Sequence, residues 1–121
     1  MTTTRAPSKI IPRAFPGIKA VEVEELIKAS QLKEYPVGTT LCREGELEYT
    51  FYLILEGEVE VTKIINNKDE RFLKTLGPGD FFGEMALIHN APRAATVRTK
   101  SALIALEISK ESFGNVLRNS P

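Results

Sequence analysis

The sequence has little of what a disulfide framework, a metal centre or a membrane span requires. Its 121 residues include one cysteine, Cys42, and one histidine, His89. A lone cysteine excludes an internal disulfide and favours a reducing compartment, so we expect a cytoplasmic location and interpret Cys42 as a small buried hydrophobe. One histidine without a cysteine or carboxylate cluster cannot build a usual metal site, which predicts no metal and a solvated loop position for His89. No apolar run approaches the ~18 residues of a spanning helix, so we expect no membrane insertion.

An excess of charge of one sign is also missing. The sixteen acidic and sixteen basic residues cancel to a formal net charge of zero. The chain therefore has no global field to attract nucleic acid or an anionic membrane, and any bound anion must be held by local donors. We expect no direct binding to nucleic acid. The length and the 42% share of apolar residues are typical of one compact domain.

Three prolines interrupt the start of the chain. Pro7, Pro12 and Pro16 stand mainly among threonine, serine, lysine and arginine, a composition that buries little and blocks regular hydrogen bonding. We therefore predict a flexible N-terminal tail or linker over residues 1–16 and a folded domain over residues 17–121.

Short β-rich runs, broken by glycine at roughly ten-residue spacing, fill most of the chain after Pro36. In residues 58–62 valines alternate with polar residues, which predicts a strand with one buried face. The polar cluster at residues 66–69 predicts a hairpin tip. Helix formers predict a short N-terminal helix over residues 19–29 and a C-terminal helix over residues 109–119. The spacing therefore predicts a mainly β fold, an antiparallel barrel or sandwich, with these two helices and one short helix described next.

The stretch FFGEMALIHNAPRAATV, residues 81–97, is not ordinary strand sequence. Gly83 can let the backbone approach a ligand closely. Residues 84–88 favour one turn of helix, whose free amide hydrogens can face an anion. The helical pattern breaks before Pro92. A small anion is therefore expected to bind beside this short cassette helix.

Arg93 and Glu84 are the candidate binding side chains of this stretch. The planar guanidinium of Arg93 matches two oxygens of a phosphate, and Ala94 and Ala95 leave its surroundings uncrowded. Glu84 cannot help to bind a phosphate because like charges repel, so its partner is a hydroxyl donor or the arginine itself. A ribose 2′-hydroxyl next to a cyclic phosphate satisfies both groups. The plain alternative is a structural ion pair between Glu84 and Arg93 at a loop.

These residues resemble a known motif. Residues 82–87, FGEMAL, and residues 93–97, RAATV, are separated by five residues and resemble the phosphate-binding cassette of cyclic-nucleotide-binding domains, close to the form in protein kinase A regulatory subunits. The resemblance covers residues 17–121. It implies a mainly β fold, an antiparallel β-roll (jelly-roll-like barrel) with a short N-terminal helix, a short cassette helix and a C-terminal helix. It also includes Gly38, the turn at residues 43–46, the strand at residues 51–54 with Gly57, and residues 76–80.

The resemblance implies a ligand site and a role for several residues. Glu84 is expected to accept a hydrogen bond from the ribose 2′-hydroxyl, and Arg93 to pair with the exocyclic phosphate oxygens. Backbone amides from Gly83 to Ala86 and at Ala94 complete the cradle. The ligand-binding residues predicted in this way are Gly83, Glu84, Met85, Ala86, Arg93, Ala94, Ala95 and Thr96. The ligand is a small-molecule cyclic nucleotide, and no cofactor is expected.

The position after Arg93 bears on the choice of base. Family members that prefer cyclic GMP often have threonine there, and this chain has Ala94, which favours cyclic AMP over cyclic GMP. The family pattern continues past the final helix into a lid helix. Because the chain stops at Pro121, we expect the lid to be missing or truncated.

The favoured function is a sensor module that relays nucleotide binding through its C-terminal helices to an output domain or partner protein. The alternative is a degenerate β-roll that serves as a scaffold or interaction domain without nucleotide. An enzyme is not expected, because the cassette has no nucleophile, metal cluster or paired acid and base. The other glutamates of the β-rich region are interpreted as a solvated face and turn residues. They are Glu44, Glu46, Glu48, Glu56, Glu58 and Glu60.

Overall fold

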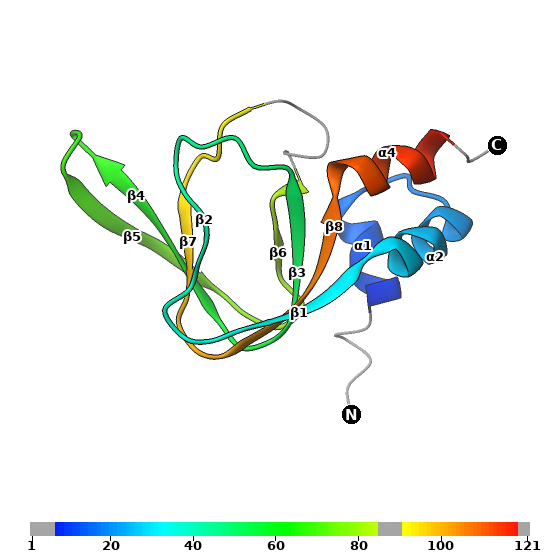
Figure 1. Ribbon diagram of the computed structural model, residues 1–121, viewed down its shortest axis with the longest axis horizontal. Helices are drawn as coiled ribbons and strands as arrows, with labels where there is room; N and C mark the ends of the chain where they lie inside the picture. The colour runs from blue at the N-terminus through cyan, green and yellow to red at the C-terminus, as the bar shows by residue number, and fades with distance from the viewer. Residues whose placement is uncertain (1–6, 85–90, 119–121) are drawn as a thin grey trace.

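The computed structural model describes residues 7–84 and 91–118. Within these residues, eight strands form two four-stranded antiparallel sheets, with the orders β1-β8-β3-β6 and β2-β7-β4-β5. The strands are β1 (Gln31–Tyr35), β2 (Thr40–Cys42), β3 (Thr50–Glu56), β4 (Val59–Ile65), β5 (Asp69–Leu76), β6 (Phe81–Phe82), β7 (Thr96–Thr99) and β8 (Leu103–Ser109). The helices are α1 (Pro7–Ala14), α2 (Ala20–Ala29) and α4 (Lys110–Arg118), and they gather on the side of β1, β3 and β8 (Figure 1).

The mainly β class and the antiparallel roll are confirmed. The description as a barrel is wrong, because the two sheets stay open: no ladder among the described strands joins the edges of one sheet to those of the other. The β4–β5 hairpin projects away from the helices (Figure 1). Its tip lies where it was predicted, and Asn66 and Asn67 there have φ angles of 56° and 64°, a left-handed conformation that asparagine tolerates well. The predicted buried face of β4 is also confirmed, with Val59 and Val61 in the interior.

Strand β3 is buried on both faces. Phe51 and Leu53 pack in the cluster beneath the helices, whereas Tyr52 and Ile54 belong to a second cluster inside the roll. Successive residues of a strand point to opposite faces. The nearly continuous apolar run of β3 therefore contributes to two cores.

The two helices predicted near the ends of the domain are confirmed as α2 and α4. The Ser109 hydroxyl accepts a hydrogen bond from the Ser112 backbone amide at 3.1 Å, which caps the first turn of α4. On the inner side of α4, the Phe113 ring packs against Phe15 with centroids 4.9 Å apart. The C-terminal helix is thus capped by the last residue of β8 at its first turn, and its apolar face packs against the N-terminal helical region.

The prediction of a flexible tail over residues 1–16 is wrong for the part that the structure describes. Helix α1 begins with a proline, a position where the missing amide needs no partner, and packs on the domain. Ile10 and Ile11 are 1% and 0% exposed. Burial of two such side chains contributes about 3 kcal/mol or more, which offsets the helical hydrogen bond lost at Pro12. Burial of these apolar side chains therefore outweighs the effect of the prolines on helix formation.

Candidate functional site

A cavity of about 650 Å³ lies inside the roll beside the cassette. Its apolar wall includes Val61, Leu76 and Val97, from strands β4, β5 and β7. Five of the predicted site residues line the same cavity, namely Gly83, Glu84, Arg93, Ala94 and Ala95. The structure therefore brings together the two halves of the sequence motif.

The backbone of Arg93 is fixed by the turn that follows β2. The Arg93 amide donates to the Glu46 carbonyl at 2.9 Å, and the Gly45 amide donates to the Arg93 carbonyl at 2.8 Å. One residue before Gly45 in the same turn, the Glu44 amide donates to the Thr96 hydroxyl at 3.0 Å. The turn thus holds the segment from Arg93 to Thr96 in place, although the two lie almost fifty residues apart in the chain.

The side chain of Arg93 is buried, with 8% of its surface exposed. Its Nη2 atom forms an ion pair with the Glu48 carboxylate and also donates to the Thr50 carbonyl at 2.6 Å. Its Nε atom is buried and has no hydrogen-bond acceptor among the described residues. A buried donor without an acceptor costs about 1–3 kcal/mol, so an anionic or carbonyl oxygen that reached this atom would be favoured.

Gly83 is required by close packing around Arg93. Its φ angle is +90°, and a Cβ atom at this position would lie 2.5 Å from the Thr50 carbonyl oxygen and 2.6 Å from Arg93 Nη1. Any other residue would displace either the strand or the guanidinium. Close approach of the Gly83 backbone was predicted for a ligand, and the structure shows it for Thr50 and Arg93.

The remaining predicted residues have different positions. Glu84 lines the cavity and is helical, as expected for the first residue of the cassette helix. Met85, Ala86 and the rest of that helix lie outside the described residues. Thr96 is not among the described residues that line the cavity. Its hydroxyl is used by the Glu44 amide, which gives it a structural role at the start of β7.

Sequence reasoning missed the partner of Arg93, Glu48, which is not among the described residues that line the cavity. Glu48 was interpreted as part of a solvated face, but it pairs with Arg93 and accepts a hydrogen bond from the Tyr52 hydroxyl at 2.9 Å. Burial, together with the charge of Glu48 and the hydrogen bond to it, raises the pKa of Tyr52 well above its usual value. The phenol therefore remains a donor. Glu44 was also misjudged, because its carboxylate accepts from the Ile64 amide at 2.8 Å.

Other polar groups at the cavity were also missed. Arg13 lines it from α1, the segment predicted to be a flexible tail, and Lys74 lines it from β5. With Arg93 they face two carboxylates, Asp80 and Glu84, and Asp80 is engaged by the Gly77 amide at 2.8 Å. The described lining therefore carries one more cation than anion, and the Glu48 carboxylate that pairs with Arg93 balances this difference. An anionic ligand is therefore favoured by the cations that stay without such a partner, or by release of Glu48.

Cys42 also lines the cavity and is a buried hydrophobe, as predicted. It is 5% exposed. Burial raises the pKa of the Cys42 thiol to about 11, and the nearby charge of Arg93 opposes this only in part. The thiol is therefore protonated near neutral pH. Among the described residues, no group of three or more histidine, cysteine or carboxylate side chains is placed to hold a metal ion, and no helix there is long and apolar enough to cross a membrane.

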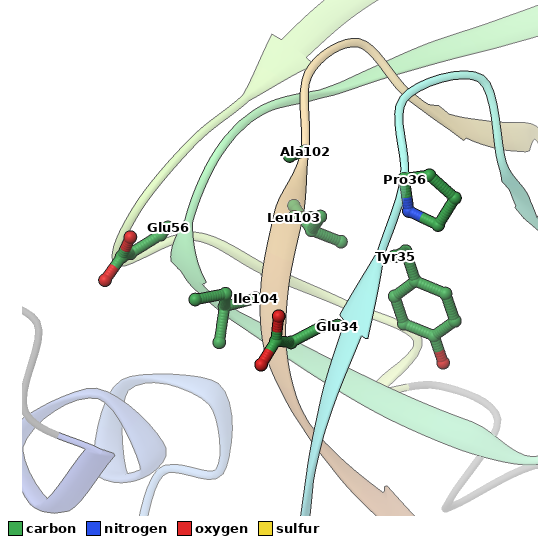
Figure 2. A pocket seen from close by; sticks show the side chains of 7 residues that line it. All are labelled: Glu34, Tyr35, Pro36, Glu56, Ala102, Leu103 and Ile104. Carbon is green, nitrogen blue, oxygen red and sulfur yellow. The ribbon is translucent and has the colours of Figure 1, made fainter.

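A second cavity, of about 410 Å³, lies at the other end of strands β1 and β3 (Figure 2). Glu34 and Glu56 flank Ile104 there, as the strand register requires, because both pair with Ile104 across β8. The other described residues that line it are Tyr35, Pro36, Ala102 and Leu103. The described lining has two carboxylates and no lysine or arginine, so this cavity does not suit a phosphate.

Comparison with known proteins matches the cyclic nucleotide-binding domain model over residues 32–120. The chain is 33% identical over 101 residues to a cAMP-dependent protein kinase regulatory subunit of Blastocladiella emersonii, covering 84% of this chain and 25% of that protein. It is 35% identical over 113 residues to a Drosophila melanogaster cGMP-dependent protein kinase, covering 88% of this chain and 12% of that protein. It thus spans a quarter or less of these two relatives.

A solved structure agrees with the sequence matches. The regulatory domain of Toxoplasma gondii PKA, crystallised with cAMP, superposes with a TM-score of 0.82 at 35% sequence identity, over 93% of this chain and 44% of that one. The chain therefore belongs to the cyclic nucleotide-binding domain family.

Proposed function

We propose that this chain is a regulatory domain that binds a cyclic nucleotide in the 650 Å³ cavity, cyclic AMP in preference to cyclic GMP. The observation that carries the proposal is the buried guanidinium of Arg93, whose Nε atom has no acceptor among the described residues. An exocyclic phosphate oxygen is the acceptor that this donor requires. Arg93 supplies charge and geometry that a phosphate matches.

The other contacts follow from the lining of the cavity. Glu84 accepts from the ribose 2′-hydroxyl, and the amides at Gly83 and Ala94 face the phosphate. Met85 and Ala86 are proposed to extend this cradle. The preference for cyclic AMP is supported by Ala94, which offers no hydroxyl to a guanine amino group. The structural neighbour crystallised with cAMP supports the same choice.

Binding is proposed to be relayed through α4, because one short segment contacts both Arg93 and the start of this helix. The Thr50 carbonyl accepts from Arg93, and the adjacent Tyr49 carbonyl accepts from the Lys110 amide at 2.9 Å. The Lys110 ammonium also lies 5.1 Å from the centre of the Tyr49 ring. A ligand that changes the contacts of Arg93 therefore acts one residue away from the first turn of α4. The ligand shifts α4 only to the extent that it has different affinities for the two arrangements of this helix.

The output is proposed to be another domain or a partner protein, and no catalytic role is assigned to this chain. One relative is named as a regulatory subunit of a cAMP-dependent protein kinase, which makes a kinase catalytic subunit the candidate partner. The competing function is a scaffold domain that binds no nucleotide. The ion pair between Arg93 and Glu48 favours it, because such a pair also serves a purely structural role.

Calorimetric titration of the chain with cyclic AMP and cyclic GMP separates these functions. We expect both to bind, cyclic AMP more tightly. The Arg93→Lys variant keeps the charge but loses the planar fork, and should weaken cyclic AMP binding by about 1.5 to 3 kcal/mol. Arg98→Lys is the matched control, because Arg98 pairs with Glu60 and Glu70 away from the cavity. Absence of binding to the unmodified chain would establish the scaffold function instead.

A further inference from the structure

The partner of Arg93 is itself an anion, and this has a consequence for binding. We propose that Glu48 is an internal competitor that holds the Arg93 guanidinium when no nucleotide is bound and that the ligand phosphate must displace. The inference rests on the proposed function of the cavity. It assigns to Glu48 a regulatory role that sets the affinity of the site.

The hydrogen bonds of Arg93 support an exchange of partners. Nη2 carries two hydrogens, and both are directed to protein acceptors, the Glu48 carboxylate and the Thr50 carbonyl. Nε has no acceptor among the described residues. A phosphate that engages two neighbouring donors of the guanidinium uses Nη2 together with either Nε or Nη1, and it must therefore take one Nη2 bond away from a protein acceptor. Glu48 is the acceptor that can leave, because Thr50 is fixed in strand β3.

Electrostatic repulsion favours the release of Glu48 when a phosphate binds to Arg93. A phosphate and the Glu48 carboxylate at one guanidinium repel each other, and the repulsion is weakly screened because Arg93 is 8% exposed. Glu48 itself is 31% exposed, so its carboxylate can move towards solvent. The backbone of Arg93 is held by Gly45 and Glu46, so the exchange requires only side chains to move.

Tyr52 provides the displaced carboxylate with a second partner. Its hydroxyl donates to the Glu48 oxygen that does not face Arg93, and it also lies 3.3 Å from the Leu41 carbonyl. The Tyr52 ring stacks on Phe82 with centroids 4.6 Å apart. Tyr52 is therefore held in place, and Glu48 can keep its hydrogen bond to Tyr52 while it moves towards or away from Arg93.

The competitor lowers the measured affinity, because only the fraction of molecules with a released guanidinium binds phosphate fully. Glu48→Gln keeps the shape and removes the charge, so it should tighten cyclic AMP binding by roughly 3- to 20-fold. Glu46→Gln is the matched control. It removes the same charge from an exposed position two residues away, and should change the affinity less than about twofold.

Titration calorimetry with cyclic AMP tests the inference, with thermal unfolding of each variant as the check on folding. Glu48→Ala serves as the second charge-removing variant if Glu48→Gln does not fold. The gain should also vanish in an Arg93→Lys background, because the competitor acts through the guanidinium. Equal or weaker binding by a folded Glu48 variant, or an equal gain from Glu46→Gln, would overturn the competitor while leaving the proposed function intact. No binding by either the unmodified chain or the Glu48 variants would overturn both.

Discussion

The two cavities of this roll differ more in how they are built than in size. One, of about 650 Å³, lies beside the cassette, and the other, of about 410 Å³, lies at the far end of β1 and β3. The second is lined mostly by residues of regular strands, with Pro36 and Ala102 just beyond the strand ends, and the strand register fixes Glu34 and Glu56 on either side of Ile104. The first includes Arg93, a buried cation outside the strands that is fixed by a distant turn. The comparison teaches that a buried cation marks the proposed binding site, whereas volume does not.

The largest expected effect comes from disturbing the packing of Gly83 against Arg93, a buried cation of a kind that the described lining of the second cavity lacks. In Gly83→Ala the Cβ atom would meet the Thr50 carbonyl oxygen at 2.5 Å, and alanine would be held at positive φ. The free energy of unfolding should fall by about 2 to 4 kcal/mol, measured by urea denaturation. Gly38→Ala is the control, because Gly38 has a φ angle of +85° and nothing within 4 Å. It should lose only about 1 to 2 kcal/mol. Equal losses would show that packing around Arg93 is not tight.

The next effect distinguishes the carboxylate of the cassette from those of the second cavity. Glu84→Gln should weaken cyclic AMP binding by about 1 to 2 kcal/mol, because the ribose hydroxyl loses a charged acceptor. The 2′-deoxy analogue has already lost that hydroxyl and should be affected far less. Equal losses for the two ligands, measured by competition titration, would assign another role to Glu84. Glu56→Gln in the second cavity should change neither affinity.

A smaller effect concerns the base. Ala94→Thr adds a hydroxyl at the cavity wall and should improve cyclic GMP binding by about 0.5 to 1.5 kcal/mol, the value of one net hydrogen bond. Cyclic AMP should change less. The argument requires a syn base and a threonine that fits without moving Arg93. If competition titrations show both nucleotides shifting equally, or cyclic AMP gaining more, base selection lies elsewhere.

The smallest effect tests the contribution of Arg13 to the charge at the first cavity. Arg13 lines it from α1 and is exposed, so its contribution is long-range and screened by salt. Arg13→Gln should lower the affinity for cyclic AMP less than about threefold, and the loss should shrink as salt is raised. Lys9→Gln is the control, because Lys9 is an exposed residue of the same helix and is not among the described residues that line the cavity. A loss that does not depend on salt would indicate a direct contact.

The local features of the fold could be predicted from the sequence. The helices α2 and α4, the hairpin tip and the alternation in β4 depend on neighbouring residues, and propensity and periodicity describe them well. Helix α1 could not be predicted in this way. Its two prolines, Pro7 and Pro12, argue for irregular structure, and only burial of Ile10 and Ile11 against distant residues makes it helical. The open edges of the sheets likewise depend on long-range pairing.

The residues of the candidate site could likewise be predicted where they lie close together in the sequence, but not where they lie far apart. Gly83, Glu84, Arg93, Ala94 and Ala95 lie within a short stretch of sequence, and the structure places all of them at one cavity. The partner of Arg93 could not be found, because Glu48 is 45 residues away in the chain and lies among several glutamates of similar surroundings. Nothing in its spacing separates it from Glu46, which is exposed. Only the fold shows that Glu48 contacts the cassette arginine, whereas Glu46 is exposed to solvent.

The most direct test of the account follows the Nε–H group of Arg93 by NMR in ¹⁵N-labelled protein, with the signal assigned by its loss in Arg93→Lys. The account predicts that cyclic AMP shifts this signal and protects the hydrogen from exchange with solvent, because the phosphate supplies the acceptor that Nε lacks among the described residues. Adenosine, which has no phosphate, should leave the signal unchanged. Cyclic AMP that binds without moving the Arg93 signal would contradict the central claim, as would an equal shift with adenosine.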